Sequence, residues 1–147
     1  LPSAMKRKYL TFLSLILLTA CNKDNKKQYS TWYVNGEMFR TNDVSVAEGK
    51  ARHIFDSGNI DNKFSIRFNL GHFPTDDRYL IKCAGQNPVW VCVTINYKHV
   101  SYDNPKTTYL QAGMHNKKFR YTLEPAWFYN VSDANDSILV KGEFNEP

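Results

Sequence analysis

The sequence lacks the charge excess that marks most nucleic-acid-binding proteins. The chain has 19 basic and 14 acidic residues, but six basic residues and one acidic residue fall within the first 28 positions. Thirteen of each sign therefore remain beyond position 28, and that part of the chain is neutral. Because affinity for nucleic acid depends on a basic surface, we expect no nucleic-acid partner.

Motifs of the common catalytic and metal centres are also missing. The sequence contains no Gly-x-Ser-x-Gly elbow, no zincin motif and no cysteine pair at zinc-finger spacing. The acidic pair Asp76-Asp77 lies in a turn, where carboxylates usually cap or face solvent. Polar or turn-like surroundings predict four surface histidines, His53, His72, His99 and His115. We therefore expect a non-enzymatic protein without a metal or another cofactor.

Long apolar runs are limited to a single short one at the N-terminus. Residues 9–18 are mostly apolar and follow three basic residues, Lys6, Arg7 and Lys8. A membrane-spanning helix needs about 20 apolar residues, so the run is too short for one. This pattern predicts a cleaved signal peptide within residues 1–20, and we read the four residues before Met5 as a cloning remnant.

The apolar run ends in the four residues Leu-Thr-Ala-Cys. This sequence resembles the lipobox of bacterial lipoproteins, and the resemblance implies cleavage before Cys21 and lipidation of its thiol. Each buried methylene of an acyl chain contributes about 0.8 kcal/mol, so a multiply acylated cysteine is a stable anchor. Residues 21–28 contain no apolar side chain after the cysteine, which predicts a polar tether that holds a domain of residues 29–147 off the membrane.

A period of two dominates the chain beyond the tether, which is typical of half-buried β-strands. Asn35-Gly36 predicts a type I′ hairpin that places Trp32 opposite Phe39. In KFSIRF (63–68) every second residue is apolar, and the same alternation recurs in later segments. Turn sequences separate about eight such strands, which predicts one antiparallel β-sandwich, with a small β-barrel as the alternative.

The lipobox, the short tether, WYVNGEMF near the start of the domain and DSILVKGEF near its end resemble small lipid-anchored envelope lipoproteins of the Bacteroidota. The resemblance implies a β-domain in the bacterial cell envelope, anchored at the outer membrane, and it supplies no catalytic residues. Only Asp24 is acidic in the tether, so the likeness to a surface-export signal is poor. The sequence is compatible with a domain on the periplasmic side of the membrane and with one on the cell surface.

Two cysteines remain in the domain, on either side of the turn sequence AGQNP. A hairpin centred between Asn87 and Pro88 would place Cys83 directly opposite Cys92, close enough for a disulfide. A shift of the turn by one residue destroys this alignment. A disulfide and two free thiols are therefore both compatible with the sequence.

The segment NVSDANDS (130–137) is rich in oxygen-bearing side chains. Asp133 and Asp136 suggest a calcium site, but the segment lacks the glycine and the terminal glutamate of an EF-hand loop, so we expect an Asx-rich turn. The tripeptide 136–138, Asp-Ser-Ile, resembles the acceptor of a general O-glycosylation pathway in the same bacterial group. This resemblance implies modification of Ser137.

Aromatic residues supply the candidate binding site. Trp90 lies on the polar face of its predicted strand, together with Thr94 and Asn96, and Trp127 and Tyr129 lie beside a predicted turn. Exposed Trp and Tyr side chains hold sugar rings or anchor protein interfaces. We expect these three residues to form a surface for a glycan or protein partner, unless they belong to an ordinary core.

A carrier function is the alternative of a different class. A lipocalin-like barrel would hold a small apolar ligand in its lumen, and it needs inward side chains that leave a cavity. The large inward candidates Phe64, Ile66, Phe68 and Tyr97 argue for a filled interior instead.

Overall fold

The computed structural model describes residues 28–69, 74–85, 87–103 and 105–147. The predicted signal peptide and the predicted lipidation site Cys21 lie outside these ranges. Within them there is no helix, and so none long and apolar enough to cross a membrane. The eleven strands are β1 (Ser30–Val34), β2 (Glu37–Thr41), β3 (Val44–Ala47), β4 (His53–Asp56), β5 (Lys63–Phe68), β6 (Arg78–Ile81), β7 (Trp90–Tyr97), β8 (Val100–Asp103), β9 (Tyr109–His115), β10 (Lys118–Asn130) and β11 (Ser137–Asn145).

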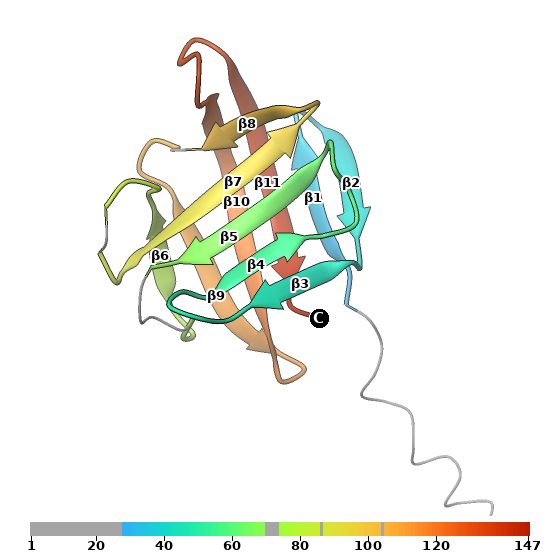
Figure 1. The fold of residues 1–147 in the computed structure, drawn as a ribbon, viewed down its shortest axis with the longest axis vertical. Coiled ribbons are helices and arrows are strands. Elements are labelled where there is room, and N and C mark those ends of the chain that lie inside the picture. Colours follow the sequence, from blue (N-terminus) through green and yellow to red (C-terminus); the bar gives the residue numbers. More distant parts are fainter. Residues whose placement is uncertain (1–27, 70–73, 86, 104) are drawn as a thin grey trace, which may run out of the picture.

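The strands form one continuous sheet that folds over on itself (Figure 1). The strand order is β2-β1-β11-β10-β9-β6-β7-β5-β4-β3, and β8 pairs with both β7 and β10. Strands β6, β7, β8, β10 and β9 thereby close a small ring, from which β5, β4 and β3 extend as a front layer and β11 and β1 as a back layer. The predicted all-β fold is confirmed, with the two layers joined through a small barrel.

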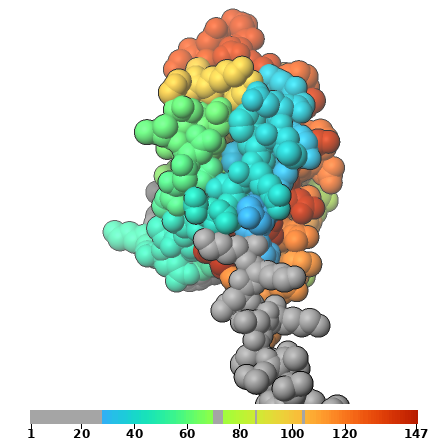
Figure 2. Space-filling view, turned by 90° about the vertical axis from the view of Figure 1, so that its right-hand side faces the viewer, coloured from blue at the N-terminus to red at the C-terminus, as the bar shows by residue number. Residues whose placement is uncertain are grey.

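The β1–β2 hairpin follows local sequence closely. Asn35 and Gly36 have φ angles of 50° and 86°, both positive as a type I′ turn requires. Trp32 pairs with Phe39 as predicted, and their rings stack with centroids 5.7 Å apart. Figure 2 shows this hairpin, in blue and cyan, between the green front layer and the orange-red back layer.

An aromatic cluster connects the two layers from inside. The buried Trp32 ring on β1 lies 5.4 Å from the Phe64 ring on β5, and Phe64 lies 4.6 Å from Phe144 on β11. The backbones of β1 and β11 lie close together beside this cluster. A Cβ atom on Gly142 would lie only 2.9 Å from the Thr31 carbonyl oxygen. Large side chains thus fill the interior, as expected for a packed core rather than a lumen.

The structure has more strands than the eight expected, and one pair is parallel. Strands β3 and β8 have only four residues each and lie among turn-forming residues, so the sequence pattern did not predict them. Strand β10 continues past Pro125 because a bulge between Leu123 and Ala126 accommodates the proline. Strands β6 and β7 run parallel, so the hairpin considered around Asn87 and Pro88 does not form between them.

A charged network ties the layers together at the end of the chain. Arg52, just before β4, donates from Nη2 to Glu146 Oε2 at 2.6 Å and from Nε to Oε1 at 3.0 Å. The Tyr121 hydroxyl also donates to Glu146 Oε1, at 2.5 Å, and burial followed by this hydrogen bond raises the pKa of Tyr121. Glu48 pairs with Arg52 from an exposed position. The Arg52–Glu146 pair is mostly buried, so its loss leaves a charge without a partner.

We predict that Arg52→Ala lowers the free energy of unfolding by about 3 kcal/mol, because the buried Glu146 carboxylate loses its counter-charge. Urea unfolding of the variant and the wild type measures this difference. Glu48→Ala is the matched control and is expected to cost less than about 1 kcal/mol, since Glu48 is exposed. Equal losses in the two variants would contradict the role assigned to Glu146.

Candidate binding surface

The back layer presents an open face to solvent, which we call the outer face: the outward-facing residues of β1, β11, β10, β9 and β6. Inward residues of these strands are buried, so alternate residues point out. Strand pairing aligns one row of outward polar side chains across all five strands: Thr31, Glu143, Thr122, Gln111 and Arg78. The row offers hydrogen-bond donors and acceptors along a line perpendicular to the strands.

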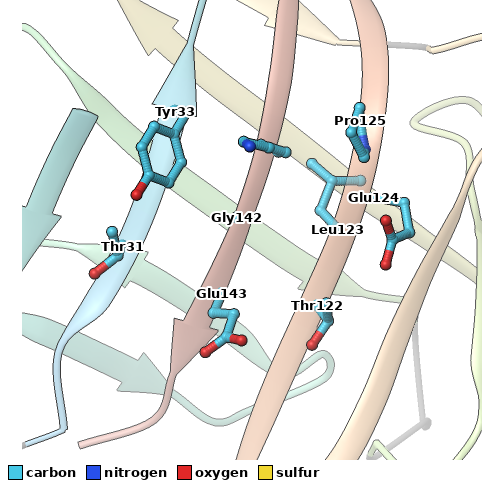
Figure 3. A pocket seen from close by; sticks show the side chains of 9 residues that line it. Thr31, Tyr33, Thr122, Leu123, Glu124, Pro125, Gly142 and Glu143 are labelled. Atoms are coloured by element: carbon cyan, nitrogen blue, oxygen red, sulfur yellow. The ribbon is translucent and has the colours of Figure 1, made fainter. Parts of the chain in front are cut away.

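A groove of about 370 Å³ lies on this face where β10 bulges (Figure 3). Tyr33 borders it on the β1 side, and Glu124 and Pro125 border it on the β10 side. Lys141 and Glu143 line it from β11, and Lys141 Nζ lies 5.0 Å from the centroid of the Tyr33 ring. The groove thus combines an aromatic wall with charged groups of both signs.

A second hollow, of about 540 Å³, adjoins the first across the β10 bulge. Thr122, Glu124 and Pro125 line both hollows, so the two form one depression across the face. Arg78 and Tyr109 line the second, with the guanidinium carbon 4.4 Å from the Tyr109 ring centroid. Each end of the depression therefore holds a tyrosine paired with a cation.

Two of the three predicted binding residues belong to the outer face. Trp127 and Tyr129 lie near the end of β10, just before the turn that follows Asn130, and the strand alternation buries Phe128 between them. Trp127 is 53% exposed and pairs across strands with the exposed Leu139. Tyr129 is half-buried, with Lys106 Nζ 5.8 Å from its ring centroid.

The third predicted binding residue, Trp90, lies elsewhere. Trp90 is the first residue of β7, which lies beyond β6, the last strand of the outer-face row. Lys82 Nζ lies 4.1 Å from the centroid of its ring, and Gly85 packs so close that a Cβ atom there would be 2.6 Å from the indole. The half-buried Trp90 ring is thus covered by its own loop, which makes it a poor platform for a ligand.

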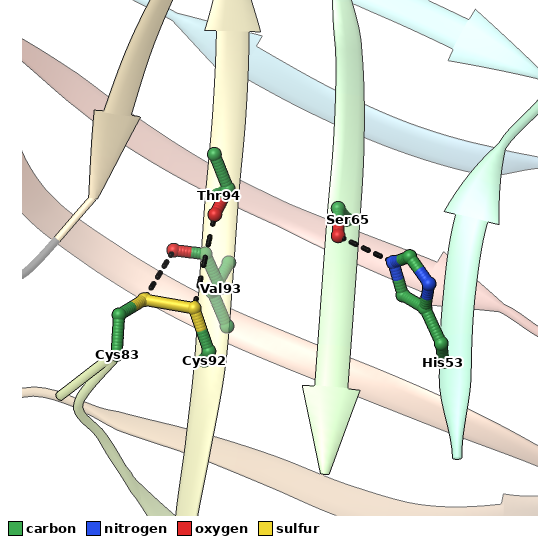
Figure 4. The surroundings of a disulfide bond; sticks show 6 residues. All are labelled: His53, Ser65, Cys83, Cys92, Val93 and Thr94. Atoms are coloured by element: carbon green, nitrogen blue, oxygen red, sulfur yellow. Dashed lines mark hydrogen bonds between the residues drawn. A yellow bond between two sulfur atoms is a disulfide. The ribbon is translucent and has the colours of Figure 1, made fainter. Parts of the chain in front are cut away.

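Cys83 and Cys92 form a disulfide in the structure (Figure 4). Their Cα atoms are 4.3 Å apart, although no hairpin brings them together. The parallel pairing of Ile81 with Val91 places the residues after β6 beside β7, and the Lys82 amide donates to the Val91 carbonyl. The disulfide holds the β6–β7 connection against the sheet.

A serine–histidine pair lies near the disulfide, on the outside of the front layer. His53 Nε2 is 2.7 Å from Ser65 Oγ (Figure 4). The expectation of a surface histidine was wrong here, because His53 is half-buried in β4. Burial, and then the positive charge of Arg67, lowers its pKa. A catalytic serine needs a histidine whose protonated form is stabilised by a carboxylate, and these surroundings have the opposite effect.

Two of the other histidines and the segment 130–137 lie as the sequence predicts. His99 and His115 are exposed in or next to turns, as predicted, and His72 lies outside the described residues. The expected Asx-rich turn is confirmed: Asn130 and Asp133 each accept a hydrogen bond from the amide two residues ahead. No group of three or more His, Cys, Asp or Glu residues in the described ranges is placed to hold a metal ion.

The predicted glycosylation site begins the last strand. Ser137 is half-buried and pairs with Tyr129 across β10 and β11. The carboxylate of Asp136 before it accepts hydrogen bonds from the Tyr102 hydroxyl and the Asn130 amide, both at 2.9 Å. These contacts hold the acidic residue of the motif in place, and modification of Ser137 stays a prediction.

Comparisons with protein-family models, with characterised proteins and with solved structures gave no match to this chain.

The lowered pKa of His53 predicts a pH-dependent stability. The unfolded chain takes up a proton near the ordinary pKa of 6.5, whereas the folded protein does so only at lower pH. The free energy of unfolding should therefore fall as the pH drops from about 7 toward 5. Chemical unfolding at a series of pH values checks this, and His53→Gln should reduce the slope. His115→Gln, at an exposed site, should leave the slope unchanged. If the slope persists in His53→Gln, another group causes the pH dependence.

Proposed function

We propose that this chain is a lipid-anchored protein of the bacterial cell envelope whose β-domain binds a glycan or protein partner through the outer face. The observation that carries the proposal is the gathering of exposed aromatic and apolar side chains beside a polar depression on one open sheet face. The exposed Tyr109, Trp127 and Leu139 belong to that face, together with the half-buried Tyr33. Exposed apolar surface of this kind is typical of interaction sites.

The chemistry of the depression favours a glycan as the partner. Its charged residues balance, with Lys141 and Arg78 against Glu124 and Glu143, so it suits a neutral ligand rich in hydrogen-bonding groups. Tyrosine rings at its two ends offer apolar faces, and Trp127 adds a larger ring on the same strand as Glu124. The two hollows are within the range of small-ligand sites, about 300–1,000 Å³.

The proposed anchor is compatible with this surface. The first strand begins at Ser30, so the predicted tether joins the domain at the start of β1. The binding face spans the middle of the back layer, across β1, β11, β10 and β9. A polar tether of several residues would let the domain turn this face toward a partner beyond the membrane.

Truncation of Trp127 tests the face directly. We expect Trp127→Ala to weaken retardation of the chain in native gels that contain soluble neutral polysaccharides. The loss should be roughly thirtyfold in affinity, because removal of an anchoring aromatic costs about 2 kcal/mol. Thermal unfolding should change little, since the Trp127 ring is exposed.

Ile60→Ala is the matched control. Ile60 is 81% exposed, in the connection between β4 and β5 and away from the outer face, so its removal should not affect retardation. Tyr33→Ala should weaken binding as Trp127→Ala does, because Tyr33 borders the groove. Wild-type retardation in both outer-face variants would show that the ligand binds elsewhere.

The anchor is tested at Cys21. We expect the chain made in a bacterial host to incorporate a fatty-acid analogue, and Cys21→Ala to abolish the labelling, because the thiol is the predicted acyl acceptor. Gel fluorescence after coupling of a dye to the analogue measures incorporation. The double variant Cys83→Ser, Cys92→Ser should label as the wild type does, since those thiols form the disulfide. Labelling that persists in Cys21→Ala would contradict the proposed anchor.

A further inference from the structure

A third hollow, of about 700 Å³, lies where β8 meets the C-terminal end of β10 (Figure 1). Asp103 of β8 and Tyr129 of β10 line it, and these two residues pair across the strands. Phe128 next to Tyr129 is fully buried, so Tyr129 and its partner Asp103 point to the outside. The hollow therefore opens on the same side of the sheet as the outer face.

Trp127 stands between this hollow and the depression. It lies two residues after Pro125, which lines the depression, and two residues before Tyr129. Residues two apart on a strand share a face and are separated by about 7 Å. Trp127 is 53% exposed, so its ring offers an apolar platform that connects the two openings.

The outward residues of β10 and β11 form a continuous strip through this platform. On β10 the strip runs from Thr122 to Tyr129, a length of about 20 Å. In its middle Leu139 of β11 lies opposite Trp127, and both side chains are exposed. The middle of the strip is therefore apolar.

Polar groups lie at both ends of the strip. Glu124 and Lys141 line the depression at one end, and Asp103 and Lys106 line the third hollow at the other. Carboxylates accept hydrogen bonds and ammonium groups donate them, so each end can bind hydroxyl groups of either orientation. Opposite charges balance at both ends, which favours an uncharged ligand over an acidic or a basic one.

The length of the strip distinguishes a chain of sugars from a single sugar. One pyranose ring can stack on only one aromatic side chain, whereas Trp127 and Tyr129 are consecutive outward residues. A single sugar on Trp127 would also reach neither the far side of the depression nor the far side of the third hollow. Only linked sugars can contact the central platform and the polar groups of both ends at once.

We propose that the outer face binds a linear, uncharged glycan of several sugar residues, which lies along β10 and β11 from the depression at Pro125 to the third hollow at Tyr129. The inference rests on the proposed function and specifies its ligand as the interior of a glycan chain rather than a single terminal sugar. Trp127 holds a sugar ring in the middle of the strip, and the polar groups at the two ends bind hydroxyls of the outer sugars.

Pairs of short and long oligosaccharides test this length directly. The probes are cellobiose with cellohexaose, maltose with maltohexaose, and mannobiose with mannohexaose. Each is titrated into the full protein in detergent, and calorimetry gives its dissociation constant. The variants are Trp127→Ala in the middle of the strip, Tyr33→Ala at the depression and Lys106→Ala at the third hollow.

We expect at least one hexasaccharide to bind about tenfold more tightly than its disaccharide, because it gains contacts at both ends. Tyr33→Ala and Lys106→Ala should each weaken hexasaccharide binding about fivefold, whereas a disaccharide is too short to respond to both. Trp127→Ala should weaken both lengths. Lys82→Ala is the matched control and should bind as the wild type does, since Lys82 is exposed beside Trp90 and outside the strip.

The outcomes that overturn the inference differ in what they leave standing. If each disaccharide binds as tightly as its hexasaccharide and Trp127→Ala weakens both, the outer face binds a single sugar and only the inferred length is wrong. A gain with length that neither Tyr33→Ala nor Lys106→Ala reduces would also refute the inferred path. If no pair binds, or if binding survives Trp127→Ala, the proposed glycan function fails as well. The wild-type comparison of the two lengths needs no substitution, so it stands even if a variant fails to fold.

Discussion

The contact of Trp32 with Phe64 is the interaction on which the rest of the structure depends. A sheet that folds over on itself is stable only if its two layers bury a common core, and these rings supply it from β1 and β5. Phe144 completes the cluster from β11. Because β1 carries both the hairpin and part of the outer face, the position of Trp32 also sets the orientation of the residues on either side of it.

The strands of the back layer serve two purposes at once. Alternate residues of β10 bury Tyr121, Leu123 and Phe128 inside and present Thr122 and Trp127 outside. The proposed binding face therefore rests on the same backbone as the core, which sets the spacing of its side chains. The bulge between Leu123 and Ala126 interrupts this alternation, and Pro125 within it lines the groove.

The surface places polar groups in two different settings. His53 Nε2 lies within hydrogen-bond distance of Ser65 Oγ, but burial, and then the charge of Arg67, lowers the pKa of His53 and disfavours its protonated form. In the outer-face depression, the polar groups lie beside aromatic rings instead. The proposed glycan combines hydroxyl groups with apolar faces and would suit the outer-face depression.

The sequence by itself determined the β class, the hairpin at Asn35-Gly36 and the inward face of most strands, because these depend on neighbours a few residues apart. Only the tertiary structure decided that Cys83 meets Cys92 through a parallel pair, that a loop covers Trp90 and that β10 continues past Pro125. The register and direction of distant strands depend on how the whole domain packs, and no local pattern encodes them. For the same reason, the hollow where β8 meets the end of β10 is invisible in the sequence.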